Sequence, residues 1–180
     1  MIGSGDRELL EHLLNRLGAE LDDLDDQAES WGASVPARQA LTTMILDAEY
    51  WKDVPDRSSD AAIYIYVFEA MCQHYGASLE SGEYTMSNEW FGEVEEAFAD
   101  VGVCCEPSEY FLGGNLPLPR AFPYPTAGWV SLDSMDLLRN EMEKALSADA
   151  DPDALDTAAE LSQWAQDCLS TQRDLVWFFY

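Results

Sequence analysis

Basic side chains are scarce in this sequence. Its 180 residues include nine Lys and Arg, only two of them Lys, and two His, against 35 Asp and Glu, so the formal net charge is −26. Residues 58–119 contain no Lys or Arg, and the acids are spread along the whole chain. Such a surface repels nucleic acid and anionic membranes and attracts cations. The composition therefore predicts a basic protein partner and no direct binding of nucleic acid or membrane.

Long apolar runs and a leader sequence are also missing. No stretch approaches 18 consecutive apolar residues, the length typical of a membrane span. The first residues have neither the basic nor the apolar region of a secretory signal. Cys72, Cys104, Cys105 and Cys168 form no C-x-x-C pair, and a chain of this length can bury a core without disulfides. We therefore expect a cytoplasmic protein with free thiols.

Catalytic and cofactor motifs are absent or incomplete. The sequence has no G-x-S-x-G nucleophile motif and no phosphate-binding glycine loop. His12 and His74 are isolated from each other, and only Cys72 and His74 are close enough in sequence to suggest a metal-ligand pair. We predict no catalytic residue, no metal and no cofactor, and we expect His74 in the core or at its boundary.

The segment around residues 149–160 partly matches a calcium-binding EF-hand loop. Asp149, Asp151, Asp153 and Glu160 stand at ligand positions, but Ala154 occupies the place that needs glycine for a sharp turn. The same residues suit a helix N-terminus with an aspartate cap followed by proline. The sequence favours the helix start.

The apolar pattern predicts one domain over residues 1–180, of the α+β class and mainly helical. The helix expected at residues 61–75 is apolar nearly all round and should be the most buried. Gly18 should end the first helix, and residues 20–34 should be irregular. Two or three short strands, including residues 128–130 and the C-terminal residues 174–180, should form a small sheet. About six helices are expected, at residues 6–18, 36–50, 61–75, 88–101, 131–147 and 152–172, with a further helical turn near 107–112.

Residues 113–125 contain four prolines, which rule out regular secondary structure there. Phe122, Tyr124 and Trp129 could line a groove for a peptide or a small molecule. The alternative, which we favour, is a packed connection that fills one side of the core.

Several short motifs occur together: Gly-Gly-Asn-Leu-Pro-Leu-Pro at 113–119, Phe-Pro at 122–123, Gly-Trp at 128–129 and the aromatic ending at 175–180. With them the chain resembles an uncharacterised bacterial family of small acidic proteins of unknown function, distantly similar to the YfbM-like proteins. The resemblance implies an α+β fold and bacterial origin but no activity. Members place a β-strand before the Gly-Ser-Gly segment, so here that strand is absent or the chain starts downstream of it.

The sequence supports three hypotheses on function. The first is a small acidic, non-enzymatic interaction protein that binds a basic partner, such as an immunity or antitoxin protein that blocks a bacterial toxin. The second is a small-ligand-binding protein or enzyme with a pocket near residues 113–129, using His74, Cys104 or a carboxylate. The third is adaptation of the whole surface to a salty cytoplasm. The predicted partner-binding residues of the first hypothesis are Asp22, Asp23, Asp25, Asp26, Glu93, Glu95 and Glu96, although Asp22–Asp26 could also be a solvated acidic loop, a cation chelator or an imitation of DNA phosphates.

Overall fold

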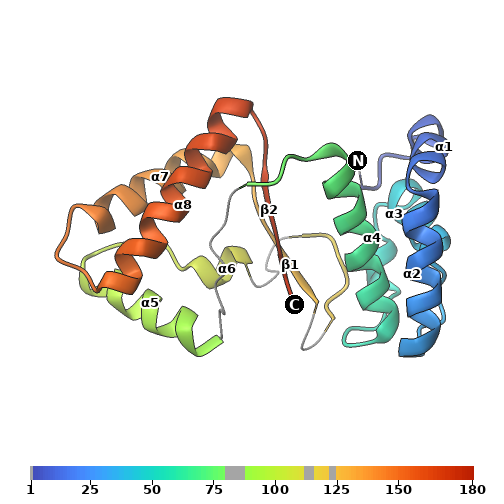
Figure 1. The fold of residues 1–180 in the computed structure, drawn as a ribbon, viewed down its shortest axis with the longest axis horizontal. Helices are drawn as coiled ribbons and strands as arrows, with labels where there is room; N and C mark the ends of the chain where they lie inside the picture. The colour runs from blue at the N-terminus through green and yellow to red at the C-terminus, as the bar shows by residue number, and fades with distance from the viewer. Residues whose placement is uncertain (1, 80–87, 112–115, 122–124) are drawn as a thin grey trace. The chain divides into compact units, whose positions relative to one another are not determined.

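Helices make up most of the chain, and two short strands complete an α+β fold (Figure 1). The computed structural model describes residues 2–79, 88–111, 116–121 and 125–180. The strands β1 (Thr126–Val130) and β2 (Leu175–Phe179) form a two-stranded antiparallel sheet. The helices are α1 (Arg7–Arg16), α2 (Gly18–Trp31), α3 (Ala37–Leu46), the 3-10 helix η1 (Tyr50–Lys52), α4 (Ser59–Tyr75), α5 (Asn88–Asp100), α6 (Pro107–Phe111), α7 (Leu132–Leu146) and α8 (Pro152–Thr171).

The predicted α+β class and both predicted strands are confirmed, but the helix count of about six was too low. The described residues form eight α-helices. The difference arises from α2, which was expected to be irregular, and from α6, which was expected to be a single turn. None of the helices in the described ranges combines the length and apolar character that a membrane crossing needs.

The chain divides into two compact units, and each is described by itself. The first unit comprises Met1–Ser78, Asn115–Ala127 and Phe178–Tyr180, and the second comprises Leu79–Gly114 and Gly128–Trp177. Compactness does not establish independent folding, so one domain over residues 1–180 stays a prediction.

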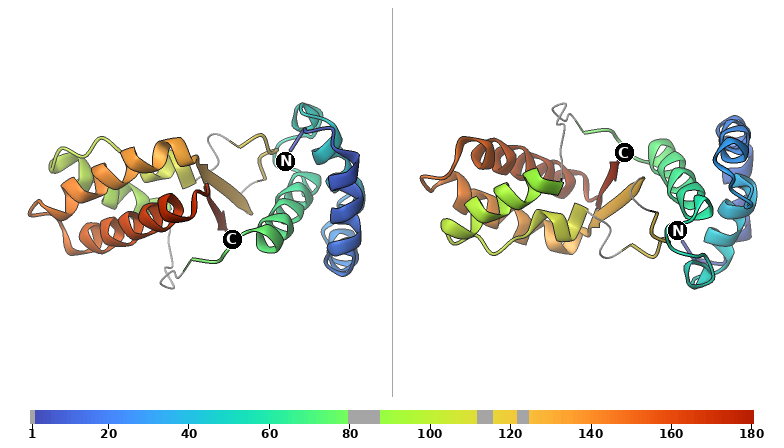
Figure 2. Two further views of the ribbon diagram at one scale, coloured as in Figure 1. Left: turned by 90° about the horizontal axis from the view of Figure 1, so that it is seen from above. Right: turned by 90° about the horizontal axis from the view of Figure 1, so that it is seen from below.

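The central element of the first unit is α4, which lies against α2 and α3 (Figure 2). The Ser58 side chain caps it by accepting a hydrogen bond from Ala61 N at 3.1 Å, and Gly76 ends it. The expected burial of this helix is confirmed, because apolar residues on several sides of it are buried. These are Ala61, Ile63, Tyr64, Ile65, Val67, Phe68, Ala70 and Met71.

Residues 20–34 are mostly helical, so the expected irregular segment and the expected helix end at Gly18 were wrong. Gly18 instead starts α2, and the helix ends at Gly32 in the left-handed conformation, with φ 72°. Leu17, Leu21 and Ala28 are buried, at the spacing of one helical face. Burial of that face stabilises α2 despite its many carboxylates.

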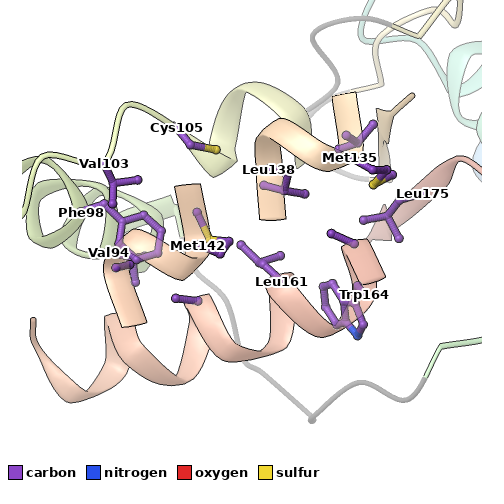
Figure 3. Close-up of a cluster of buried hydrophobic side chains, with 14 of the residues drawn as sticks. Val94, Phe98, Val103, Cys105, Met135, Leu138, Met142, Leu161, Trp164 and Leu175 are labelled. Carbon is purple, nitrogen blue, oxygen red and sulfur yellow. The ribbon is translucent and has the colours of Figure 1, made fainter. Parts of the chain in front are cut away.

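In the second unit α7 and α8 form a helical hairpin, side by side in both views of Figure 2. Its apolar core joins this hairpin to α5 and to the start of β2, with Phe98, Met135 and Met142 fully buried (Figure 3). The Trp164 and Trp177 rings pack there with centroids 4.8 Å apart. The unit therefore has an aromatic and methionine-rich core of its own.

The EF-hand-like segment begins α8, as the sequence favoured. The Asp151 carboxylate accepts a hydrogen bond from Asp153 N at 2.9 Å, and Pro152 takes the first helical position. Ala154 lies within α8 and is 1% exposed, so the residue at the glycine position of an EF-hand is helical and makes no sharp turn. No group of three or more potential metal ligands occurs in the described part of the chain.

Candidate partner-binding surface

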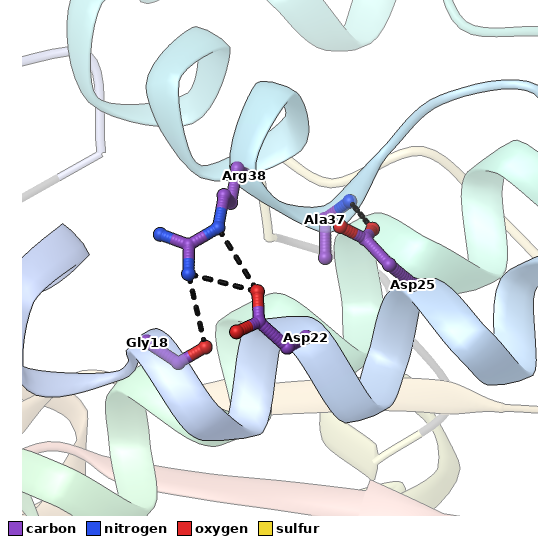
Figure 4. A network of polar contacts seen from close by, with 5 residues as sticks. All are labelled: Gly18, Asp22, Asp25, Ala37 and Arg38. Atoms are coloured by element: carbon purple, nitrogen blue, oxygen red, sulfur yellow. Dashed lines mark hydrogen bonds and ion pairs between the residues drawn. The ribbon is translucent and has the colours of Figure 1, made fainter.

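Two of the predicted partner-binding aspartates join α2 to α3 (Figure 4). The Arg38 guanidinium donates from Nη2 to Asp22 Oδ1 at 2.8 Å and to the carbonyl oxygen of Gly18 at 3.1 Å. The Ala37 backbone N–H donates to Asp25 Oδ1. Pro36 precedes α3 and has no side-chain oxygen to cap it, so Asp25 supplies the cap from a neighbouring helix. Both carboxylates therefore have structural contacts within the first unit.

Asp23 and Asp26 lie on the same helix and are exposed, as is Asp22. No hydrogen bond or ion pair engages the carboxylates of Asp23 and Asp26 among the described residues. Their charges therefore face water, which is what steering of a cationic partner requires.

The predicted acidic residues of α5 likewise divide into one that is hydrogen-bonded and two that face water. Glu95 is half-buried and its Oε1 accepts a hydrogen bond from Ser108 N at 2.7 Å, at the start of α6. Glu93 and Glu96 are exposed. Because α5 belongs to the second unit and α2 to the first, the seven predicted residues form two acidic groups, one on each unit. That any of them binds a partner stays a prediction.

Sequence reasoning missed the carboxylate that is most buried among the described residues. Glu141 on α7 is only 7% exposed, accepts a hydrogen bond from Cys104 N at 2.9 Å and pairs with Lys144. The hydrogen bond from Lys144, reinforced by that from Cys104 N, lowers the pKa of this carboxyl. Glu141 serves to hold the segment before α6, not to face a ligand. The one local signal of its burial is the set of apolar residues three or four positions away on the helix, Leu137, Leu138 and Ala145.

Asp60 has a similar internal role in the first unit. Its carboxylate accepts hydrogen bonds from Ser34 N, Ser34 Oγ and Val35 N at 2.6–3.0 Å. Partial burial opposes ionisation, but these hydrogen bonds outweigh it and lower the pKa of Asp60. The carboxylate thus fixes the connection between α2 and α3 to the first turn of α4.

The predicted groove falls mostly outside the described residues. Phe122 and Tyr124 are among residues 122–124, which the structure does not describe, and Trp129 is half-buried on β1. A cavity of about 10 Å³ in the second unit is lined by Trp90, Phe91 and Trp164, among others. That volume holds about one water molecule. Trp129 does not line it, so the pocket near residues 113–129 stays a prediction.

The candidate catalytic groups of the second hypothesis are not brought together. His74 is exposed on the first unit, 4.8 Å from the ring of Tyr75 and 6.4 Å from that of His12, so its expected core or boundary position was wrong. Cys104 is exposed on the second unit. Burial raises the pKa of the Cys72 and Cys105 thiols to about 12, which keeps them protonated and unreactive at neutral pH. All four cysteines are free, as predicted.

Comparison with known proteins gives a family and no activity. A family model described as a domain of unknown function, DUF7691, matches residues 1–180. The chain belongs to this family. No curated protein and no solved structure matches it significantly. Membership confirms the prediction that the chain belongs to an uncharacterised family. The family model covers both units of this DUF7691 chain.

Proposed function

We propose that this DUF7691 protein is a non-enzymatic interaction protein that binds a basic protein partner through its acidic surface. The specific instance we propose is a bacterial immunity or antitoxin protein that blocks a cationic toxin in the cytoplasm. The observation that carries the proposal is the net charge of −26, with exposed carboxylates on both units. Charge of this size steers a cationic partner and accelerates association.

The net charge of −26 already subtracts the nine basic residues, and several of these are paired with carboxylates within the protein. Arg38, Lys52, Arg139 and Lys144 each form an ion pair with a nearby carboxylate of the same unit. Each paired cation is neutralised locally, so the field beyond the surface is set by the remaining acids. This supports attraction of a cation over attraction of an anion.

The sequence resemblance supports the remaining parts of the proposal. The motifs quoted above support bacterial origin and a distant similarity to YfbM-like proteins, and the free cysteines support a reducing compartment. None of these observations names the toxin, so the partner is defined here only by its positive charge.

The experiment begins with capture from an extract of the native host on the immobilised full chain at low salt. The retained partner is then titrated against the wild type and two quadruple variants. The test variant neutralises Asp23, Asp26, Glu93 and Glu96 as Asn or Gln. The control removes four exposed charges elsewhere, at Glu11, Asp53, Asp149 and Asp156. Neutralisation of the test set should weaken binding about fourfold or more, since exposed pairs contribute ~0.2–1 kcal/mol each and four are removed.

The dependence of the affinity on salt shows whether the binding is driven by charge. Affinity for a basic partner should fall steeply as salt rises above physiological strength. A captured partner whose affinity does not change with salt would contradict charge-driven binding. Equal losses in the two variants would instead reject the assigned residues and leave the charge-driven mechanism standing.

A further inference from the structure

Three aromatic rings form a connected row on the first unit. The Tyr66 ring lies 5.2 Å from that of Trp31 and 6.1 Å from that of Tyr180, measured between centroids. The interplanar angles are 30° and 14°, so the Trp31 ring is tilted against Tyr66 and the Tyr180 ring is stacked on it. Trp31 ends α2, Tyr66 is on α4, and Tyr180 follows β2. We call Trp31, Tyr66 and Tyr180 the aromatic row.

Both ends of the aromatic row face solvent. Trp31 is 40% exposed and Tyr180 58% exposed, whereas Tyr66, which contacts both, is half-buried. Next to it, Phe178 packs on the buried Phe68 with centroids 5.9 Å apart. That apolar contact holds the end of the chain on α4, so the aromatic row is not required to fix the chain end there. Exposed aromatic rings held in place are typical of contact sites for a partner.

The surroundings of the aromatic row are negative. Burial raises the pKa of Tyr180, and so does its hydrogen bond with the carboxylate of Glu69. Glu69 also accepts a hydrogen bond from Gln73 Nε2 at 2.9 Å. The last turn of α2, which ends at Trp31, has no basic side chain, so no positive charge of that turn opposes the negative end of the helix dipole. Ring faces beside a carboxylate and a helix C-terminus complement a cation.

Another exposed tryptophan of the same protein already has a cation beside its ring, which makes it a useful comparison. Trp51 is 38% exposed, nearly as much as Trp31, but the Lys52 ammonium lies 5.7 Å from its ring centroid. Trp51 therefore has a cation from its own chain. Trp31 has Tyr66 on one side and no such cation among the described residues.

We propose that the aromatic row receives an arginine side chain of the basic partner, with its guanidinium stacked on an outer ring and hydrogen-bonded toward Glu69. This inference rests on the proposed function and adds where and how one residue of the partner binds. Arginine fits better than lysine because the planar guanidinium stacks on rings and can bond a carboxylate at the same time, and because it is less strongly hydrated.

The test uses the full chain and two peptides of equal length and charge, one of alternating Arg and Gly and one of alternating Lys and Gly. Affinities are measured by fluorescence anisotropy at physiological salt. Wild type should prefer the arginine peptide by about two- to fivefold, the effect of one exposed cation–π contact. Trp31→Leu keeps an apolar side chain but lacks a ring face, so it should lose this preference. Trp51→Leu, the matched control, should retain it, and neither variant changes the net charge.

Tyr180→Leu provides a second variant at an exposed position in case Trp31→Leu is poorly folded by circular dichroism. It too should reduce the preference for arginine. If the preference persists in each of Trp31→Leu and Tyr180→Leu that folds, or is lost equally in Trp51→Leu, the aromatic row is not the arginine site. In that case salt-sensitive binding of both peptides would leave the proposed function intact. Absence of salt-sensitive binding by either peptide would count against the proposed function itself.

Discussion

Glu141 is the one buried carboxylate among the described residues, and its two hydrogen bonds give it a calculable role in stability. Replacing it by Gln removes the charge-assisted bonds to Lys144 and Cys104 N. We expect Glu141→Gln to lower the free energy of unfolding at pH 7 by about 1–2 kcal/mol. Urea denaturation followed by circular dichroism measures this value. Glu143→Gln, an exposed change on the same helix, should stay within about 0.5 kcal/mol.

The same residue predicts a dependence on pH. The pKa of Glu141 is lowered in the folded state. Its contribution to stability is therefore complete above the pKa of a glutamate in the unfolded chain, about 4.3, and is lost as the pH falls through its lower pKa in the folded state. The difference between wild type and Glu141→Gln should therefore be largest above about pH 5 and shrink below about pH 4. A difference as large below pH 4 as at pH 7 would show that the lost stability comes from packing and not from the charge.

At the scale of elements, the start of α3 depends on a side chain from α2. Asp25→Ala removes the acceptor for Ala37 N and should lower the free energy of unfolding by about 1 kcal/mol, the usual effect of losing a helix cap. Asp26→Ala, one residue further and exposed without a described contact, should change it by less than about 0.5 kcal/mol. Chemical denaturation of the two variants side by side makes the comparison. Equal stability of Asp25→Ala and Asp26→Ala would mean that the cap is dispensable.

Most helices could be predicted from sequence because their signals are local. Ser58 before α4 and the Asp151–Pro152 pair before α8 are cap signals that the structure places where expected. The segment of α2 was missed because acids interrupt its apolar spacing and Gly18 resembled a helix end. Gly18 instead starts α2, and its carbonyl oxygen accepts a hydrogen bond from Arg38.

The internal roles of the candidate site residues could not be predicted in the same way. Asp22 and Asp25 contact α3, and Glu95 contacts α6. These contacts depend on how helices pack together, and a run of carboxylates in the sequence looks the same whether its members cap a neighbouring helix or face water. Asp23, Asp26, Glu93 and Glu96 are exposed, and what separates them from the three bonded acids is that helix packing gives those three a hydrogen-bond donor.

At the scale of the whole molecule, a net charge of −26 opposes compaction by self-repulsion. Raising NaCl from about 10 mM to about 150 mM shortens the screening length from ~30 Å to ~8 Å. The melting temperature should therefore rise over this range, by about 2–4 °C for each kcal/mol of repulsion removed. Thermal unfolding followed by circular dichroism measures it, with sucrose at equal osmolarity as a control for effects other than screening.

The same melts separate partner binding from salt adaptation. A protein with an acidic surface for binding should be folded at 10 mM salt and only gain stability above it. Loss of the fold at low salt, with recovery only at molar salt concentrations, would favour adaptation to a salty cytoplasm. The acidic charge would then no longer indicate a basic partner.

The first unit is assembled from three separate stretches of chain, the last of them Phe178–Tyr180. All residues of the second unit lie between the first and the last of these stretches. During synthesis, helices α1 to α4 therefore emerge long before the strand end that supplies Phe178 to Phe68 and Tyr180 to the aromatic row. The first unit, and with it the proposed arginine site, is completed only after the ribosome has made the whole second unit.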